Sequence, residues 1–474
     1  MTTSTLLESQ QWAQLEFSVA DLGDGRRSKR LVQVASALAQ CPSGTLPQAF
    51  PDWADLKGAY RLFSNKAVTY EKILTPHWQR TRQSCTEAGE YLLIEDTSDL
   101  DYSAHRACSG LGRIGNDYGR GLCLHTLLAT KVHAWDLNHC PELQVLGVAG
   151  QKCWARTDSS HRKKKERWRQ RLKRPRESQR WAQGLSQMPA RPAQASWIFI
   201  ADRDADDYEV FERCQQRACD FIIRAQHDRR LAGQQQSLFA AVAQGALLGR
   251  FEVEVRARPE RAPRTAQIEV RAMKVSLQGV WRPGGARPDL TVNVVEAREV
   301  GAPADEEAIH WILLTSLPVE RFVEARRIVA RYAKRWVIEE FHKALKTGAQ
   351  VEKSELETAE RIQALLAVLV VVAVRLLNTK MLARSQPDQG VDIQSFGPEA
   401  VELLTARFGE PQGGWTYQSL LIAIARMGGF LARRGDGQPG WITIWRGWQR
   451  LMTMVEGVQS LAKKTEGLEA KRCG

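Results

Sequence analysis

The sequence predicts an α/β protein in three parts: a helical N-terminal domain, a central domain built around a sheet, and a helical C-terminal domain. Three observations predict this class. Short apolar runs between residues 90 and 225 end in polar residues, as buried strands do. Residues 225–318 alternate apolar and polar residues, which indicates antiparallel strands. Helix signals dominate both ends of the chain.

Residues 1–75 are predicted to form the first domain, which is helical and basic. A turn at residues 22–27 leads into a helix whose first turn carries Arg26 and Arg27. A second helix is indicated at residues 56–63. The pattern fits a small DNA-binding domain, and it also fits a helical layer that only covers a core.

Residues 76–380 are predicted to form the central domain, and two aspartates mark its candidate site. Apolar runs indicate four buried strands, at residues 91–94, 122–131, 197–201 and 221–223. Asp96 and Asp202 each follow such a run. If these strands are neighbours, both carboxylates lie at one edge of the sheet, where ligands of open α/β sheets commonly bind. An aspartate after a strand also commonly forms a turn or caps a helix, so the position alone leaves both roles open.

Residues 381–474 are predicted to form the third domain, with helices near residues 398–408, 417–433 and 442–462. Before it, residues 364–374 form the longest apolar run of the chain. A run of this length is too short to cross a hydrocarbon layer of about 30 Å as a helix. It therefore predicts a buried core element, and no membrane partner is expected.

Charge and cysteine content indicate the partner and the compartment. The net charge is +13 and the pI is about 9.4, which suits DNA because each phosphate contact releases a counterion. The nine cysteines form no CxxC pair, so a reducing cytoplasm fits and neither a disulfide framework nor a zinc site is indicated. The N-terminus lacks signal-peptide features. A dense basic run at residues 162–180 is either a solvated face or an arm that contacts phosphates.

A single helix predicted at residues 331–346 gathers an unusual set of polar groups on one face. At 100° per residue, that face holds Tyr332, Arg335, Glu339, His342, Lys343 and Lys346. The opposite face is apolar and holds Val337, Phe341, Ala344 and Leu345. One acid among bases suits a metal-binding carboxylate flanked by cations that bind phosphate. A solvated amphipathic helix gives the same pattern, so the helix alone leaves both interpretations open.

Asp96, Asp202 and Glu339 together suit phosphoryl transfer on divalent ions. Mg²⁺ prefers oxygen ligands and keeps exchangeable waters. In a two-metal site, one ion activates the attacking oxygen and the other stabilises the leaving oxygen. We therefore expect two Mg²⁺ ions, with Mn²⁺ as an alternative, and nearby Arg and Lys side chains that neutralise phosphate charge.

The spacing of four residues in the predicted helix resembles a family signature. Tyr332, Arg335, Glu339 and Lys346 match the pattern Y-(2)-R-(3)-E-(6)-K of hairpin-forming insertion-sequence transposases, a bacterial DDE-class family of cut-and-paste enzymes. The run IEEFHKA, the following KTG, and the segments IEDT and DRDAD that hold the two aspartates are similar to the Tn-five group of this family. Similar segments extend nearly end to end, from LGDGRR near the N-terminus to ARMGGF near the C-terminus.

The resemblance implies an RNase H-like catalytic core with an antiparallel β insertion at about residues 226–318, an end-recognition domain before it and a dimerisation domain after it. It also implies the chemistry. Water cuts one strand at each element end, the freed 3′-OH forms a hairpin, water reopens the hairpin, and the 3′-OH joins target DNA. The implied partners are double-stranded DNA, at terminal inverted repeats and at the target, and a second copy of the chain. The implied location is the bacterial cytoplasm, at the nucleoid.

The resemblance also implies roles for individual residues. Metal binding falls to Asp96, Asp202 and Glu339. Contacts with DNA fall to Tyr332, Arg335, Lys346, Arg224, Arg26, Arg27, His342 and Lys343. Trp311 is expected to stack on a base flipped out near the hairpin, which is worth about 1–3 kcal/mol. A tryptophan in a β segment is also commonly a core residue, so that alternative stays open.

Two other functions remain open on the sequence alone. A DNA-binding repressor without enzymatic activity would not need the three carboxylates, and a stand-alone RNase H-like nuclease would not need a C-terminal dimerisation domain. The first methionine after Met1 is Met188, so an inhibitor that starts just past the DNA-binding domain is not expected.

Overall fold

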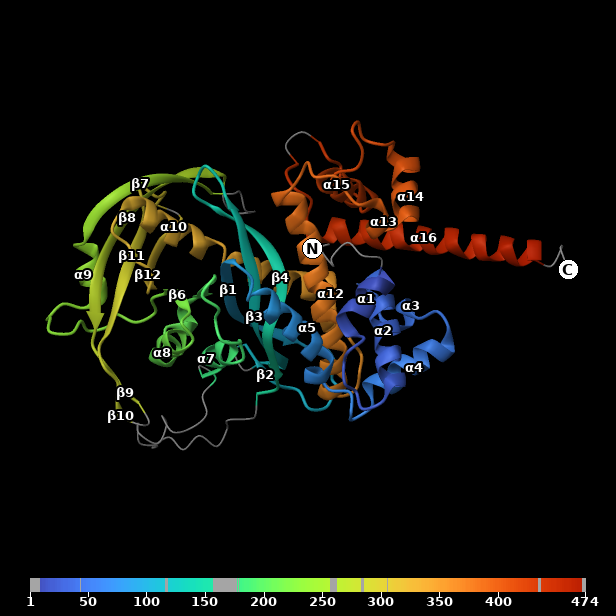
Figure 1. Cartoon of the computed structure of the whole chain (residues 1–474), viewed down its shortest axis with the longest axis horizontal. Helices are drawn as coiled ribbons and strands as arrows, with labels where there is room; N and C mark the ends of the chain where they lie inside the picture. Colours follow the sequence, from blue (N-terminus) through green and yellow to red (C-terminus); the bar gives the residue numbers. More distant parts are fainter. Residues whose placement is uncertain are drawn as a thin grey trace.

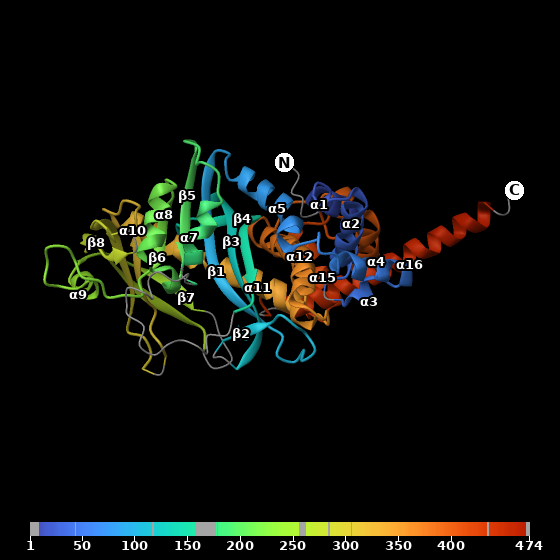
Figure 2. The ribbon, with the colours of Figure 1, turned by 90° about the horizontal axis from the view of Figure 1, so that it is seen from below.

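The computed structural model describes residues 9–42, 44–115, 118–156, 177, 179–255, 262–282, 285–304, 306–433 and 436–470. The first helices, within residues 9–63, lie across one long helix from the large sheet (Figures 1 and 2). The mixed α/β class with helical ends, predicted from the sequence, is confirmed. Most of the basic run at residues 162–180 lies outside the described residues.

The N-terminal region is a group of helices: α1 (Ser9–Phe17), α2 (Gly25–Gln40), α3 (Leu46–Ala49), α4 (Trp53–Phe63) and α5 (Tyr70–Ser84). The helix predicted after the turn at residues 22–27 is α2. It begins there because the Asp24 carboxylate accepts a hydrogen bond from the backbone N–H of Arg26. Its apolar face, which includes Leu31 and Leu38, is buried, and α2 packs against the long helix α12 (Ala359–Ser385).

The central sheet has ten strands in the order β2-β3-β1-β5-β6-β12-β11-β8-β7, with β4 paired to β3. Its strands are β1 (Gly89–Asp101), β2 (Gly112–Ile114), β3 (Gly119–Trp135), β4 (Pro141–Trp154), β5 (Ala195–Ala201), β6 (Asp220–Arg224), β7 (Ala246–Val255), β8 (Arg264–Leu277), β11 (Leu290–Val300) and β12 (His310–Thr315). The pairs β1–β5 and β5–β6 are parallel. The antiparallel segment predicted at residues 225–318 is confirmed, and because β12 pairs with β6 it extends the same sheet.

Side chains of β1 enter two different cores, one on each face of the sheet. The helices beside the sheet are α7 (Gln179–Ser186), α8 (Tyr208–Gln216), α9 (Leu238–Ala243), α10 (Phe322–Ala333) and α11 (Trp336–Lys343). Ile94 packs into the core that includes α10, α11 and α12, whereas Leu93 packs into the core that includes α7 and α8. Because side chains alternate along a strand, Asp96 points to the face of α11 and Glu95 to the face of α7.

The sequence placed Asp96 after the end of a strand, and this prediction is wrong. β1 continues to Asp101, and Asp96 lies opposite Thr126 of β3. The strand continues because β3 pairs with it along almost its whole length, whereas the parallel partner β5 ends at Ala201. Asp202 does follow the end of β5, as predicted.

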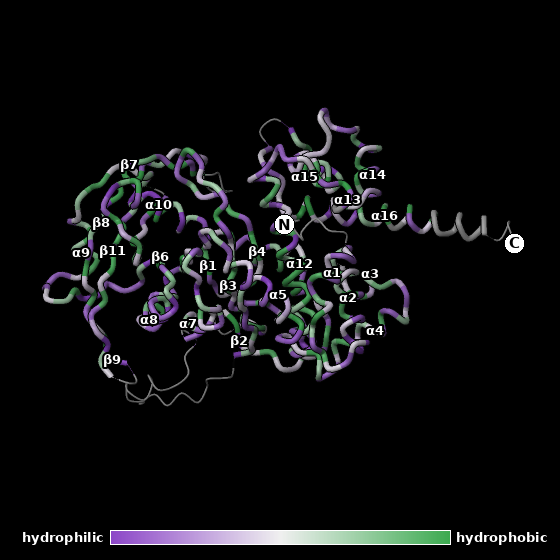
Figure 3. The backbone as a smooth tube through the Cα atoms, viewed as in Figure 1, coloured by the Kyte–Doolittle hydropathy of each residue, from purple (hydrophilic) through white to green (hydrophobic). Residues whose placement is uncertain are grey.

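Helix α12 is the centre of the fold. Among the described residues it is the one helix long and apolar enough to cross a membrane, yet 89% of its most apolar window is buried inside the protein. The N-terminal helices, β4 and the C-terminal helices pack around it, and Figure 3 shows hydrophobic residues concentrated along it. The buried core element predicted at residues 364–374 is therefore confirmed.

The C-terminal region contains α13 (Ile393–Phe396), α14 (Pro398–Phe408), α15 (Tyr417–Met427) and α16 (Trp441–Ala470). The predicted helix at residues 398–408 has the observed bounds, whereas α16 is longer than predicted and projects away from the other elements (Figures 1 and 2). α5 and α12 each run across a predicted domain boundary, at residue 75 and at residue 380 respectively. These two boundaries stay predictions.

Candidate active site

Asp96 and Asp202 lie side by side because β1 and β5 are parallel neighbours. Ile94 of β1 pairs with Ile200 of β5. Asp96 comes two residues after Ile94, and Asp202 comes two residues after Ile200. The Asp202 carboxylate accepts a hydrogen bond from the backbone N–H of Asp204, 2.9 Å away, and caps a short 3₁₀ turn. The two roles that the sequence left open for an aspartate after a strand are therefore combined at Asp202, which lies at the sheet edge and also caps a turn.

Glu339 comes to the aspartates on α11. The single helix predicted at residues 331–346 is wrong: α10 ends at Ala333, α11 begins at Trp336, and a π-helical turn, η3 (Ala344–Gly348), follows. The break forms because backbone N–H groups there bond three residues back, as from Arg335 to the Tyr332 carbonyl. Tyr332 therefore belongs to α10, while Glu339 is carried by a separate short helix against β1.

Arg335 joins two of the carboxylates. Its Nη1 donates to Asp96 Oδ2 at 2.8 Å and to Glu339 Oε1 at 3.2 Å, and its Nη2 also donates to Glu339 Oε1 at 3.2 Å. These are charge-assisted bonds within a partly buried group. One guanidinium thus joins Asp96 of β1, which is 239 positions before Arg335 in the chain, to Glu339 of α11.

Negative charge exceeds what Arg335 neutralises at this point. The pKa of the Asp96 carboxyl is raised to about 7, because burial and the charges of Asp202 and Glu339 raise it more than the charge of Arg335 lowers it. Two carboxylates that share a site resist ionising together. The arrangement therefore favours an additional cation between the acidic side chains.

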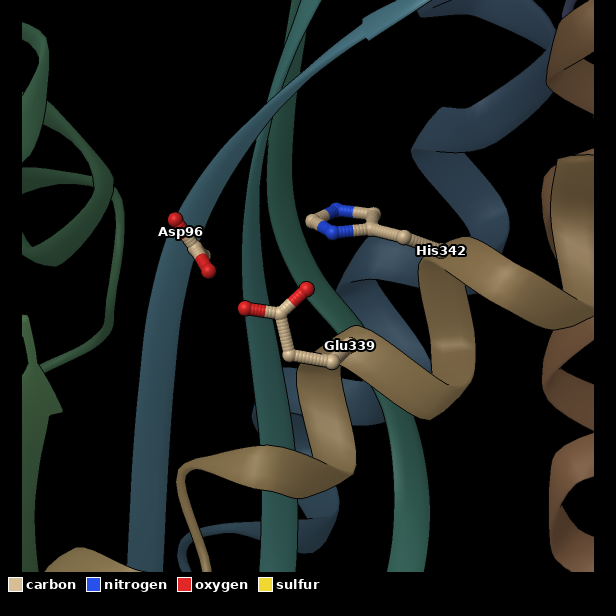
Figure 4. Close-up of side chains that lie close together, drawn as sticks. All are labelled: Asp96, Glu339 and His342. Atoms are coloured by element: carbon tan, nitrogen blue, oxygen red, sulfur yellow. The ribbon is translucent and has the colours of Figure 1, made fainter. Parts of the chain in front are cut away.

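The acidic group fits a divalent ion. Asp96, Glu339 and His342 each offer one ligand atom, and these three atoms lie within 4.8 Å of one another. Figure 4 shows the two carboxylates and the imidazole turned toward a common space. Asp202 is not a member of this tight group, although its charge acts on Asp96. Carboxylate oxygens are the donors that hard divalent ions prefer.

His342 does not lie as the helical wheel predicted. The sequence placed it on the polar face of the helix, whereas the structure leaves it only 5% exposed on α11, which contacts β1. Its pKa is lowered to about 3, chiefly by burial and also by the nearby cations Lys346 and Arg335. The ring is therefore neutral at physiological pH. Its Nε2 atom is buried and has no hydrogen-bond partner among the described residues.

Three residues expected to contact DNA gather beside the carboxylates. The rings of Trp311 and Tyr332 meet edge to face with their centroids 5.0 Å apart. Arg224 hydrogen-bonds with the side chain of Tyr332 and donates to the carbonyl of His310 at 2.9 Å. Trp311 is half-buried and packs against the hydrophobic core, so core packing accounts for part of its position.

The other cationic residues expected to contact DNA differ in their exposure and in their partners. Lys343 is exposed, and Lys346 is half-buried on η3. In the N-terminal region the Arg26 side chain is 92% exposed and pairs with Asp24 at 3.0 Å. Arg27 donates to a carbonyl of the preceding turn, so part of its hydrogen-bonding capacity holds the start of α2.

Sequence reasoning missed a buried network on the other face of β1. Glu95 is fully buried, and its Oε1 lies 3.1 Å from Nε2 of His125. The other ring nitrogen of His125 hydrogen-bonds with the Thr97 hydroxyl at 2.7 Å. A Cβ on Gly184 would lie 2.2 Å from Glu95 Oε1, so α7 can approach only because this residue is glycine. Glu95 and Thr97 flank Asp96 in β1. Their polar side chains at alternate positions of the strand were the sequence signal that could have indicated this network.

A second missed group connects the helix that carries Glu339 to the C-terminal helices. The neighbouring Glu340 accepts hydrogen bonds at Oε2 from Lys380 at 2.5 Å and from Trp441 Nε1 at 2.8 Å. Further along, a Cβ on Gly348 would lie 2.2 Å from the Trp445 ring. Nothing in the local pattern of the sequence pairs these residues, because they come from α11, η3, α12 and α16.

The burial of Asp96 and the repulsion from its acidic neighbours predict a stability effect. Because the folded-state pKa is raised from 3.8 to about 7, the folded protein loses stability from this group as pH rises between these values, and the loss is complete above about pH 7. In the presence of a metal chelator at pH 8, the melting temperature of Asp96→Asn should therefore be higher than that of the wild type, by roughly 2 °C or more. At pH 4 to 5 the difference should shrink. Thermal unfolding followed by circular dichroism measures it, and a difference that does not change with pH would contradict the charge repulsion.

Comparisons with known families give three matches along the chain. Residues 9–68 match the model described as transposase DNA-binding. Residues 155–375 match the transposase DDE domain, which includes Asp202 and Glu339. Residues 372–467 match the transposase Tn5 dimerisation domain. The order of the three matches along the chain is the one that the sequence resemblance implied.

Proposed function

Because the chain belongs to the Tn5-like DDE transposases, DNA phosphoryl-transfer enzymes with a DNA-binding and a dimerisation domain, we propose that it moves an insertion sequence by a cut-and-paste reaction. The steps are hydrolysis at the element ends, hairpin formation and reopening, and joining of the 3′-OH to target DNA. The observation that carries this proposal is the convergence of Asp96 and Glu339 on Arg335, with the charge of Asp202 acting on Asp96.

Asp96, Asp202 and Glu339 are the proposed metal ligands. The family uses divalent ions, and we propose two Mg²⁺, with Mn²⁺ able to replace them. When bound, such ions activate the attacking oxygen and stabilise the leaving oxygen. The chain itself holds the carboxylates in place, since β1, β5 and α11 are rigid elements and Arg335 ties two of the acids together.

The proposed DNA path lies along the cations beside this site. Arg335, Tyr332 and Lys346 would bind backbone phosphates near the scissile bond, with Lys343 and His342 on the same short segment and Arg224 nearby. The net charge of +13 supports a long contact with a polyanion. At the other end of the molecule, Arg26 and Arg27 at the start of α2 would contact the terminal inverted repeat.

Trp311 is proposed to hold a flipped base during hairpin formation. Its half-buried ring rests on Tyr332, 5.0 Å between centroids, beside the carboxylates. Removing a stacking platform worth about 1–3 kcal/mol should slow the step that needs the flipped base by about 10- to 100-fold. Trp311→Ala should therefore slow hairpin formation much more than the first nick, as measured by single-turnover cleavage of end DNA. Trp311→Phe should retain part of the rate, and equal slowing of both steps would contradict the stacking role.

The match to a dimerisation domain supports a functional unit made of two copies of the chain. We propose a homodimer in which each catalytic domain cuts the element end held by the partner's N-terminal domain. We also propose that this complex acts in the bacterial cytoplasm, where its chromosomal substrate lies.

The test of the function uses the purified chain and a supercoiled plasmid that carries the inverted repeats flanking its gene. With Mg²⁺ we expect nicks at the repeat ends, hairpin-ended excised DNA and joined products. Binding without cleavage would favour a repressor. Cleavage without hairpins and without joining would favour a stand-alone nuclease, and either result would contradict the proposal.

A further inference from the structure

His342 is a buried imidazole beside the acidic group. Its ring extends from α11 toward Asp96 and Glu339 (Figure 4), and the residue is only 5% exposed to solvent. Its Nε2 has no hydrogen-bond partner in the described part of the chain. Buried polar atoms almost always have a partner, so the imidazole has a binding capacity that the described residues do not use.

The neighbours of the imidazole ring show what kind of ligand fits. The ligand atoms of Asp96, Glu339 and His342 lie within 4.8 Å of one another. Two donors on one metal ion, each at about 2.1–2.2 Å, are separated by no more than about 4.4 Å, so small side-chain shifts would bring all three onto one ion. The two carboxylates exclude an anion, and Arg335 already donates hydrogen bonds to both of them.

We propose that His342 supplies a nitrogen ligand to a divalent ion shared with Asp96 and Glu339. The inference rests on the proposed metal-dependent function and deepens it by naming a ligand outside the three carboxylates. Carboxylates and water suit both Mg²⁺ and Mn²⁺, but the transition-metal ion Mn²⁺ accepts an imidazole nitrogen more readily than the hard Mg²⁺ ion, which prefers oxygen ligands. His342 therefore makes this position bind Mn²⁺ more tightly than a site with carboxylate ligands alone.

The test measures metal–nitrogen contact directly and does not depend on activity. The full-length protein, labelled with ¹⁵N-histidine, is loaded with Mn²⁺ alone and studied by pulsed electron paramagnetic resonance. We expect ¹⁵N hyperfine coupling in the wild type. His342→Gln should abolish the coupling and weaken Mn²⁺ binding by about tenfold or more, whereas Mg²⁺ binding should change by less than about threefold.

A matched control and a second variant complete the experiment. His133 is a partly exposed histidine that pairs with Glu142 on the surface, and His133→Gln should leave the coupling unchanged. His342→Asn replaces His342→Gln if the larger amide prevents folding, which circular dichroism reports. A wild type that binds no Mn²⁺, or binds it without ¹⁵N coupling, overturns the inference, as does coupling that persists in a folded His342 variant. Cleavage of the donor plasmid is scored separately, so the proposed transposition can stand or fail by itself.

Discussion

Asp96→Asn, Asp202→Asn and Glu339→Gln are each expected to abolish DNA cleavage while binding of the element ends survives. Each change replaces a carboxylate by a neutral amide of almost the same shape and removes one charge from the proposed metal site. Loss of a preorganised electrostatic group commonly costs about 10²–10³-fold in rate, and we expect a loss of at least about 10³-fold for each variant, or about 4 kcal/mol of transition-state stabilisation. Single-turnover nicking of end DNA with Mg²⁺ measures the loss.

Binding of end DNA is the control for this prediction, and the N-terminal region supplies the opposite phenotype. Arg26 is remote in sequence from the carboxylates and 92% exposed, so Arg26→Ala should weaken end binding and leave the acidic group unchanged. A nicking rate within tenfold of wild type in any carboxylate variant would remove that residue from the site. A loss of binding together with cleavage would indicate a folding defect instead.

Glu340→Ala should cause a large loss of stability, because it leaves a buried cation without its partner. Glu340 pairs with Lys380, whose side chain is 6% exposed and lies 2.5 Å from the carboxylate, and it also accepts from Trp441 at 2.8 Å. Burial lowers the pKa of Lys380 to about 8 even though Glu340 raises it. Without Glu340 the ammonium stays buried and unpaired, which commonly costs about 3–5 kcal/mol. Urea unfolding at pH 7 measures the difference.

The double variant Glu340→Ala/Lys380→Met separates the buried charge from the loss of packing. Removing both charges should restore part of the lost stability, because an apolar pair of similar size is often tolerated. Glu402 is an exposed glutamate on the C-terminal helix α14, and Glu402→Ala should change stability by less than about 0.5 kcal/mol. If Glu340→Ala were as mild as Glu402→Ala, the contact between α11 and the C-terminal helices would be unimportant for the fold.

Elements with a strong local pattern were predicted correctly from the sequence. α2 begins where Asp24 can cap it, and α14 ends at Phe408 as expected. The alternation at residues 225–318 gave antiparallel strands. These features depend on neighbouring residues, because capping, helical spacing and strand alternation act over a few positions.

Two predictions of where an element ends were wrong. The polar residues after Ile94 suggested a strand end, but pairing with β3 carries β1 on to Asp101. The regular spacing at residues 331–346 suggested one helix. At Arg335, however, the backbone N–H bonds to the carbonyl three residues back, and a separate helix, α11, begins at Trp336. At β1, pairing with a distant strand outweighed the local preference, whereas the helix break depends on local backbone hydrogen bonds that the side-chain spacing does not reveal.

The sequence by itself determined the fold class, the basic character and the types of residue that carry the chemistry. Only the tertiary structure decided which of them meet: Arg335 between Asp96 and Glu339, and the buried His342 beside them. The physical reason is that burial and electrostatic attraction act between elements that are far apart along the chain. Such contacts produce no repeating pattern in the sequence. A local pattern can therefore identify a carboxylate or an imidazole, but its protonation, its exposure and its partners are set by the fold around it.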